Sequence, residues 1–316
     1  MTHDHPTPGA KPTAMSVVEG INLTNKTSVI TGATSGLGRE TARALAAAGS
    51  YVIIAARDTS RLAKTTMWIT ERVPTARISA VTLDLTSLAQ VRVAAEHIRA
   101  LAPAIDILIN NAGVMFTPFG RTTDGFEIQM GTNHLGHFAL TQWLTPHLVA
   151  AEGARVVNLS SDAHRLSDID LSDIHWKRAR YDKFRAYSAS KTANILHAVE
   201  LDRRLSSSGV RGYAVHPGSV ATKLARHMTA DDLVAINRIT AQTHSAVTTS
   251  DEFSREVVIA EVGAATQVWA ATSPELADRG GIYLSDCHVT DAAPFASDVQ
   301  RAKRLWPLSA SACAVG

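Results

Sequence analysis

Short apolar runs alternate with longer stretches of helical periodicity along most of the chain. We expect strands at the apolar runs, which lie at 27–30, 51–56, 78–83, 105–109, 155–159, 210–216 and 281–284. We expect helices between them, at 36–48, 58–72, 87–101, 132–150, 187–206 and 262–271. The alternation predicts an α/β fold, with a single Rossmann-type doubly wound parallel sheet of about seven strands and helices on both faces.

Three stretches depart from this alternation. Residues 1–20 are polar and proline-rich and are expected to form a flexible tail, so that 21–316 make one domain. Residues 223–261 are rich in Thr, Ala and His, and we interpret them as a substrate lid. Residues 163–185, which contain Trp176 and Phe184, form a second irregular stretch. Both irregular stretches follow strands, so both are expected at the carboxyl edge of the sheet, where ligands bind in such folds.

Composition excludes several classes of protein. The net charge of +2 implies no general affinity for nucleic acid, and 45% hydrophobic residues is ordinary for a globular protein. Two cysteines, Cys287 and Cys313, cannot make a disulfide framework and suit a reducing compartment. No apolar run approaches the ~18 residues that span a bilayer. We therefore expect a cytoplasmic protein with no membrane or nucleic-acid partner.

A glycine-rich turn follows the first expected strand and opens the first helix. Its sequence is T-G-x-x-x-G-x-G at 31–38. Glycines allow a tight turn and close approach of the backbone, and the N-terminus of a helix accepts the charge of a pyrophosphate. We interpret the turn as a dinucleotide site rather than a plain turn with a capped helix. The expected contacts are Gly32, Thr34, Ser35, Gly36, Leu37 and Gly38.

The end of the second strand indicates which nicotinamide cofactor binds. An acidic residue there would hydrogen-bond the ribose 2′-hydroxyl of NAD. Here Ala55 and Ala56 are uncharged and Arg57 follows, and a guanidinium can hold a 2′-phosphate, which favours NADP(H). Alternatively, Asp58 binds the ribose or Arg57 is merely exposed. Asp58 suits the N-cap of the following helix better.

Tyr187 and Lys191 place a phenol and an ammonium group four residues apart, on one face of an expected helix. A free tyrosine has a pKa near ~10, and a nearby cation lowers the pKa of a phenol. The pair can therefore act as a general acid/base. The alternative is an exposed tyrosine beside a solvated lysine. Of the five tyrosines, only Tyr187 has lysine four residues later.

The chain resembles the short-chain dehydrogenase/reductase family from about 24 to 306. The resemblance rests on motifs in the right order at successive strand ends: T-G-x-x-x-G-x-G, Asp84-Leu85, Asn110-Asn111-Ala112-Gly113, Asn133, Ser160-Ser161, Tyr187 with Lys191, and Pro217-Gly218 with Thr222. The runs V-V-N-L-S-S-D-A-H at 156–164, A-V-H-P-G at 214–218, Y-L-S-D-C at 283–287 and R-L-W at 304–306 resemble the retinol-dehydrogenase-like branch.

This resemblance implies an oxidoreductase that moves hydride between a nicotinamide and a carbonyl or alcohol. Tyr187 would be the acid/base, and Lys191 would lower its pKa and hold the nicotinamide ribose. Ser161 would orient the substrate oxygen, with Ser160 packed beneath the strand end, and Asn133 would hold a water that connects Lys191 to solvent. For the cofactor, Asp84 and Leu85 would contact adenine, and Asn110 and Gly113 would contact the adenine-side ribose and the phosphates. Thr222 would contact the nicotinamide amide. Further cofactor contacts are expected from Ala112, Tyr187, Lys191, Pro217, Gly218 and Val220.

The sequence also departs from the family pattern. Ser161 and Tyr187 are about twice as far apart as is common, beside the helix that many relatives use to form tetramers, so we expect a monomer or homodimer. The N-terminus has no apolar anchor of the kind found in membrane-bound retinol dehydrogenases, so membrane residence and retinoid activity are not carried over. His134, His137 and His164 could bind a metal, but structural or substrate-lining roles are preferred and no metal is expected.

We therefore predict an NADP-dependent carbonyl reductase acting on a small, mostly apolar molecule. A cofactor-binding regulator or scaffold without turnover is one alternative, but such proteins typically lose the tyrosine or the lysine. An NAD-linked alcohol dehydrogenase is another. The substrate could be lined, in part, by a set of apolar residues: Trp176, Phe184, Leu224, Met228, Leu233, Ile236 and Phe253.

Overall fold

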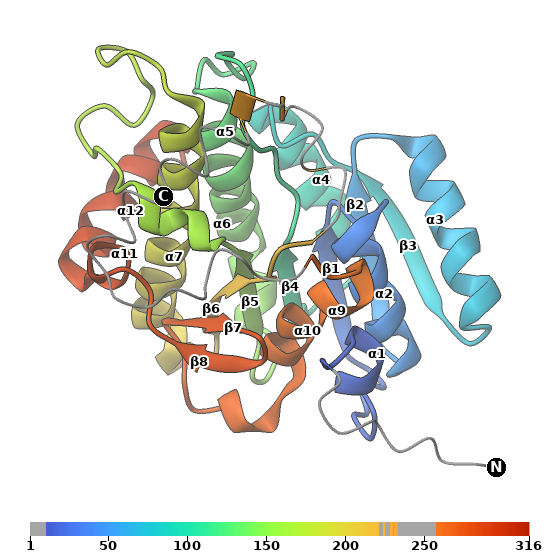
Figure 1. Ribbon diagram of the computed structural model, residues 1–316. Helices are drawn as coiled ribbons and strands as arrows, with labels where there is room; N and C mark the ends of the chain where they lie inside the picture. Colours follow the sequence, from blue (N-terminus) through green and yellow to red (C-terminus); the bar gives the residue numbers. More distant parts are fainter. Residues whose placement is uncertain (1–10, 221–223, 225–227, 230, 233–256, 316) are drawn as a thin grey trace.

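A computed structural model describes residues 11–220, 224, 228–229, 231–232 and 257–315. Within these residues the sheet has eight strands, in the order β3-β2-β1-β4-β5-β6-β7-β8 (Figure 1). The strands are β1 (Thr27–Thr31), β2 (Tyr51–Ala56), β3 (Arg77–Thr82), β4 (Ile107–Asn110), β5 (Arg155–Leu159), β6 (Arg211–His216), β7 (Ile282–Ser285) and β8 (His288–Thr290). The first seven are parallel, and β8 pairs antiparallel with β7.

The predicted Rossmann-type fold is confirmed, with one strand more than expected. Strand β8 has three residues, all exposed, so it lacks the apolar run by which the other strands were recognised. The order reverses between β1 and β4, because the chain leaves β3 at one edge and returns beside β1. This reversal is the point at which open α/β sheets bind ligands.

Helices cover both faces of the sheet (Figure 1). One apolar layer includes α4 (Leu88–Leu101), α6 (Gly136–Val149) and α7 (Lys183–Leu205), and the other includes α2 (Gly36–Ala47), α3 (Thr59–Arg72) and α10 (Ala265–Thr272). In β2, Ile53 packs in the first layer and Ile54 in the second. Successive strand side chains point to opposite faces, so a sheet covered on both sides needs strands that are apolar throughout.

Shorter elements connect these layers. They are α1 (Ala14–Val17), α5 (Ile128–Met130), a π-helical turn η1 (Gly131–Leu135), 3₁₀ turns η2 (Asp162–Leu166), η3 (Ser206–Ser208) and η5 (Pro274–Leu276), and α9 (Ala260–Gly263), α11 (Pro294–Ser297) and α12 (Val299–Cys313). Helix α12 packs against α7 and α6. No helix was expected there; Pro307 lies inside it, and proline usually interrupts helices.

One predicted boundary is wrong for a definite reason. The helical stretch expected at 132–150 is present, because the π-helical turn η1 leads directly into α6, which ends at Val149. The helix expected from Tyr187 begins four residues earlier, at Lys183. There the carboxylate of Asp182 accepts hydrogen bonds from the backbone N–H groups of Phe184 and Arg185, which caps the helix.

The predictions for the N-terminal tail and for the lid have different outcomes. Residues 1–20 were expected to be a flexible tail, but α1 is capped by Thr13 and buries Ala14 and Val18 against the layer that contains α10. The tail prediction is thus wrong for 13–18, while 1–10 lie outside the described residues. The predicted lid at 223–261 lies mostly outside them too.

Candidate active site

The glycine-rich turn leaves β1 at the edge where the strand order reverses. Gly32 and Gly36 have φ values of 67° and 53°, in the left-handed region that favours glycine. A Cβ atom on Gly32 would lie 2.8 Å from the Cα of Ala112, and one on Gly38 would lie 2.5 Å from Nδ2 of Asn111. The turn and the segment after β4 therefore approach so closely that side chains larger than hydrogen would clash at both positions.

Buried hydrogen bonds hold these two segments together. The hydroxyl of Thr31 accepts from the backbone N–H groups of Asn111 and Ala112, each at 3.0 Å, and lies 2.8 Å from Nε2 of His137. Nδ1 of His137 lies 3.0 Å from the carbonyl oxygen of Asn133. A carbonyl can only accept, so Nδ1 carries the proton and Nε2 accepts from Thr31. Burial lowers the pKa of His137 to about 4, which keeps this neutral form.

The turn fits the pyrophosphate of a dinucleotide. Ser35 occupies the N-cap position of α2 but makes no side-chain capping bond, so the first N–H groups of the helix are not taken by a cap. Such donors, with the helix dipole, favour an anion. At the end of β2, Arg57 is exposed, and Asp58 accepts from the N–H of Arg61 at 2.9 Å. The expectation that Asp58 caps the next helix is confirmed.

The other expected cofactor residues are placed differently. Asp84 binds the N–H and hydroxyl of Thr86 through one carboxylate oxygen, and Leu85 is buried beside it. Asn110 is 1% exposed and its amide donates to Thr141 Oγ1 and Asn158 Oδ1, at 3.1 and 2.8 Å. Its side chain thus points into the core, toward the hydroxyl of Thr141 and the amide of Asn158, and the expected contact of Asn110 with the cofactor stays a prediction.

The loop after β6 returns to the glycine turn. Gly218 has a φ of 80°, and Val220 forms a parallel bridge with Val258. A Cβ on Gly263 of α9 would lie 2.5 Å from Cγ2 of Val220 and 2.8 Å from Cδ2 of Leu37. The expected nicotinamide-side residues Pro217, Gly218 and Val220 therefore stand at the same edge as the turn. Thr222 lies outside the described residues.

Asn133 lies in the π-helical turn η1, and π turns occur often at functional sites. Its Oδ1 accepts from the N–H of Val114 at 2.8 Å, and its Nδ2 donates to the carbonyl of Val114 and the hydroxyl of Ser190, both at 3.0 Å. A Cβ on Gly113 would lie 3.2 Å from Asn133 Oδ1 and 3.9 Å from Lys191 Nζ. Asn133 thus fastens the segment after β4 to α7, beside Lys191.

The two adjacent serines after β5 face different partners. Ser160 is buried and donates to the backbone carbonyl of Lys191 at 2.9 Å. Ser161 instead hydrogen-bonds Tyr187 and accepts from the N–H of Ala163 at 3.2 Å. Successive side chains of extended backbone point to opposite sides, so only one of the two can reach the phenol. Orientation of the substrate by Ser161 stays a prediction.

Tyr187 and Lys191 are 3% and 4% exposed. Burial raises the pKa of Tyr187 to about 12, and the hydrogen bond from Ser161 opposes that rise. Burial lowers the pKa of Lys191 to about 8. The ammonium group lies 5.6 Å from the centroid of the phenol ring and donates to the carbonyl of Leu159 at 2.9 Å. Burial therefore sets the direction of the Tyr187 pKa shift, and the expected lowering of that pKa by Lys191 is not found; the phenol is protonated at neutral pH.

The three histidines considered for a metal make other contacts. His134 lies 2.8 Å from the hydroxyl of Ser309, and His137 bonds Thr31 and Asn133 as above. Nε2 of His164 accepts from the N–H of Ala293, so its Nδ1 donates to the carbonyl of Ser161. Over the described part of the chain, no three His, Cys, Asp or Glu side chains group as a metal site would require.

The expected substrate-lining residues are only partly brought together. Phe184 packs edge-on to Phe116, whose ring in turn contacts Tyr187 at a centroid distance of 5.1 Å. Trp176 packs against Tyr181 instead. Leu224 and Met228 are half-buried, and Leu233, Ile236 and Phe253 lie outside the described residues. Sequence reasoning missed Phe116, because no local pattern distinguishes it from any other apolar residue after a strand.

Comparison with known proteins identifies the relatives. Residues 26–233 match the model for the short chain dehydrogenase family. Human retinol dehydrogenase 13 is 39% identical over 97% of this chain and 88% of its own length. A chloroplastic short-chain dehydrogenase TIC 32 A from Brassica napus is also 39% identical, over 95% of this chain and 92% of its own.

Solved structures that resemble this chain lead to the same family. An uncharacterised Mycobacterium paratuberculosis protein is 34% identical with a TM-score of 0.74, and the match covers 97% of this chain and 98% of that one. A Burkholderia cenocepacia short chain dehydrogenase in complex with NADP is 25% identical with a TM-score of 0.64, covering 84% and 97%. None of the described helices has the length and apolarity to cross a bilayer. The match to the family model and the identity to its relatives show that the chain belongs to the short-chain dehydrogenase/reductase family, in the retinol-dehydrogenase-like branch.

Proposed function

We propose that this protein is an NADP(H)-dependent oxidoreductase that interconverts the carbonyl and alcohol of a small, mostly apolar molecule. The observation that carries the proposal is the burial of Tyr187 beside Lys191, with the Ser161 hydroxyl acting on the phenol. It lies at the sheet edge that also holds the glycine turn. A protonated phenol is the form that can give a proton to a carbonyl oxygen during reduction.

Each residue of the cluster has a definite task in this proposal. When bound, the nicotinamide supplies or takes the hydride, and the protein supplies position and charge. Ser161 and Tyr187 both hydrogen-bond the substrate oxygen, and Tyr187 transfers the proton. Lys191 holds the nicotinamide ribose and restores the proton to the phenol. Asn133 keeps the segment after β4 in register with α7, which fixes the geometry that proton transfer requires.

The choice of NADP(H) rests on the end of β2. Arg57 is exposed there, while the carboxylate of Asp58 is occupied as a helix cap and is a poorer ligand for a ribose hydroxyl. The relative from Burkholderia cenocepacia was solved with NADP, which supports the same choice. The remaining cofactor contacts are proposed at the glycine turn, Asp84, Leu85, Ala112, Gly113, the loop with Pro217, Gly218 and Val220, and Thr222.

Two further features of the proposal concern the location of the protein and its oligomeric state. We place the protein in the cytoplasm because its two cysteines, Cys287 and Cys313, are both free. We favour a monomer or homodimer over a tetramer because α12 packs over α7 and α6 and covers part of their outer surface.

The test is oxidation of NADPH, with NADH in parallel, against a panel of aldehydes and ketones. Wild type and Tyr187→Phe are compared, and cofactor binding is followed by the fluorescence of the reduced nicotinamide. Turnover that favours NADPH and falls ~10²–10⁴-fold in the variant, with cofactor binding kept, is the expected result. Turnover that survives in the variant would show that Tyr187 is not the acid/base. Bound NADPH without turnover on any carbonyl would favour the binding-only scaffold.

A further inference from the structure

The backbone at Phe116 has an unusual conformation. Its φ is 51°, in the left-handed region that bulky side chains rarely adopt, yet the residue is only 5% exposed. A strained conformation persists only where the surroundings impose it, and such residues cluster at functional sites. The ring of Phe116 meets that of Tyr187 edge-on, at a centroid distance of 5.1 Å and an interplanar angle of 73°.

A second aromatic ring also packs against Phe116. Phe184 lies 4.8 Å from it, with an interplanar angle of 62°. Phe184 is in the first turn of α7, within the long stretch that separates Ser161 from Tyr187. Edge-to-face packing has preferred ring angles, so Phe116, which packs against both rings, restricts the ring of Tyr187.

A buried amide holds the Phe116 backbone in place. The N–H of Phe116 donates to Oε1 of Gln129 at 2.8 Å. Nε2 of Gln129 donates to the hydroxyl of Tyr181 and to the carbonyl of Lys183, both at 2.9 Å. An N–H can only donate and a carbonyl can only accept, so the Gln129 amide has one possible orientation. It joins the strained residue directly to the segment that precedes α7.

Tyr181 is the anchor of that segment. Its hydroxyl lies 3.1 Å from both the carbonyl of Thr117 and Oε1 of Glu127. Glu127 is fully buried and accepts from the N–H groups of Gln129 and Met130, so it caps α5. Burial raises the pKa of Glu127, and the three hydrogen bonds counteract that effect. The extra length between the serine and the tyrosine is therefore docked onto the segment 116–130 through Tyr181.

We propose that Phe116 is a positioning residue for Tyr187 and that the segment before α7 braces it through Tyr181 and Gln129. The inference rests on the proposed function, in which Tyr187 transfers the proton. Loss of the Phe116 ring frees the phenol to tilt and lets water reach it, which affects proton transfer more than the binding of either substrate. The segment before α7 thus stabilises the position of the Tyr187 phenol and does more than lengthen a loop.

The first test compares Phe116→Ala with Phe138→Ala. Phe138 is equally buried but packs under α12 against Trp306 and His197, so its loss leaves a cavity of similar kind away from Tyr187. We expect kcat for aldehyde reduction to fall ~10–100-fold in Phe116→Ala, with the Kd for NADPH within about twofold of wild type. In Phe138→Ala, kcat is expected to stay within about threefold. Phe116→Tyr keeps the ring and should restore kcat.

The pH profile gives a readout that a general loss of stability would not move. Burial is what raises the pKa of Tyr187, so water admitted by Phe116→Ala should lower it. The alkaline fall in kcat for reduction is therefore expected at lower pH in Phe116→Ala than in wild type or Phe138→Ala. Equal alkaline limbs in all three proteins would overturn the proposal.

The support that Tyr181 and Gln129 give to Phe116 is tested by a double-mutant cycle. Tyr181→Phe removes only the hydroxyl and is expected to lower kcat about three- to tenfold by loosening Gln129. Because Tyr181 acts through Phe116, the same change should have no further effect in a Phe116→Ala background. Independent, multiplying effects of the two substitutions would show that the segment does not act through Phe116.

A spectroscopic readout separates this inference from the proposed function. The chain has five tyrosines, so 3-fluorotyrosine gives a simple fluorine NMR spectrum in which Tyr187→Phe identifies the Tyr187 signal. That signal should shift or broaden in Phe116→Ala and keep its position in Phe138→Ala. If wild type turns over no carbonyl, the proposed function fails, yet this result still stands. An unchanged signal in Phe116→Ala would overturn the positioning role whatever the activity.

Discussion

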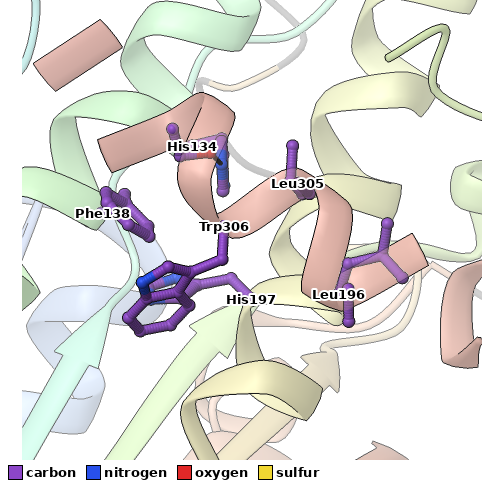
Figure 2. Close-up of a pocket in the computed structure, with 8 residues that line it drawn as sticks. His134, Phe138, Leu196, His197, Leu305 and Trp306 are labelled. Carbon is purple, nitrogen blue, oxygen red and sulfur yellow. Dashed lines mark hydrogen bonds between the residues drawn. The ribbon is translucent and has the colours of Figure 1, made fainter. Parts of the chain in front are cut away.

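Two buried polar clusters are built from the same two helical segments and differ in what surrounds them. One contains Asn133, Tyr187 and Lys191 at the carboxyl edge of the sheet. The other contains His134 and His197 beneath α12, where Figure 2 shows their rings beside Phe138, Leu305 and Trp306. Asn133 and His134 are consecutive in the π-helical turn, so one turn serves both clusters.

The difference lies in access to the strand ends. At the sheet edge, Lys191 donates to the carbonyl of Leu159, and the glycine turn stands nearby with helix N–H groups free of a side-chain cap. Beneath α12 the histidines are enclosed by aromatic rings, and the ring centroids of His197 and Trp306 lie 5.8 Å apart. Nε2 of His197 has no hydrogen-bond partner among the described residues. Buried polar groups alone therefore do not make a candidate site; they must also face donors that a ligand can use.

The largest expected effect separates the two serines that adjoin the edge cluster. Ser161→Ala removes the hydroxyl that bonds Tyr187, and turnover of aldehydes should fall ~10²–10³-fold. Ser160→Ala removes a bond to the backbone of Lys191 and should cost about 1 kcal/mol of stability with activity within about fivefold. Steady-state kinetics and urea unfolding of both variants provide the measurement. The reverse order of activities would mean that Ser160 is the substrate-orienting residue.

Acid should destabilise the protein through its buried histidines. Burial lowers the pKa of His134 to about 3 and those of His137 and His164 to about 4, below the ~6.5 of an exposed histidine. The unfolded chain binds protons first as pH falls, so this stability is complete above pH ~6.5 and is lost progressively below it. At pH ~5 the loss is about 2 kcal/mol per histidine. Urea unfolding across that range checks it, and a flat profile would contradict the buried neutral state.

Exchange of Arg57 for Asp tests how far the edge site extends along β2. The carboxylate would repel a 2′-phosphate and could accept from a ribose hydroxyl, so the preference for NADPH over NADH should fall at least ~10-fold. The ratio of kcat/KM for the two cofactors is the measurement, and Arg61→Asp, on the exposed first turn of α3, is the matched control. An unchanged ratio in Arg57→Asp would remove Arg57 from the cofactor site.

The smallest effect on activity is expected beneath α12. His197→Leu removes one buried neutral histidine whose pKa is lowered well below its usual value. The variant should keep kcat within about threefold and lose stability less steeply between pH ~6.5 and ~4 than wild type does. Kinetics and urea unfolding at several pH values decide the point. A large loss of activity in a folded variant would show that this cluster takes part in the reaction.

The fold class, the family and most of the residues that gather at the sheet edge could be predicted from local sequence patterns. Apolar runs predicted seven of the eight strands, because strands buried on both faces need apolar side chains at every position. The glycines of the turn and the Tyr187–Lys191 spacing are local requirements, so they can be recognised without contacts. The cap at Asp58 was predictable for the same reason, since it involves residues of one helix turn.

Tertiary packing set the features that depend on distant contacts. It turned Asn110 into the core, assigned His137 its tautomer, set the pKa of Tyr187 by burial and placed Phe116 against that ring. It also covered α7 with α12 and ordered the chain from Thr13 onwards against the layer that contains α10. Each of these depends on at least one group tens of residues away in the chain, as Thr31 is from His137, and local sequence patterns do not show which distant groups will meet.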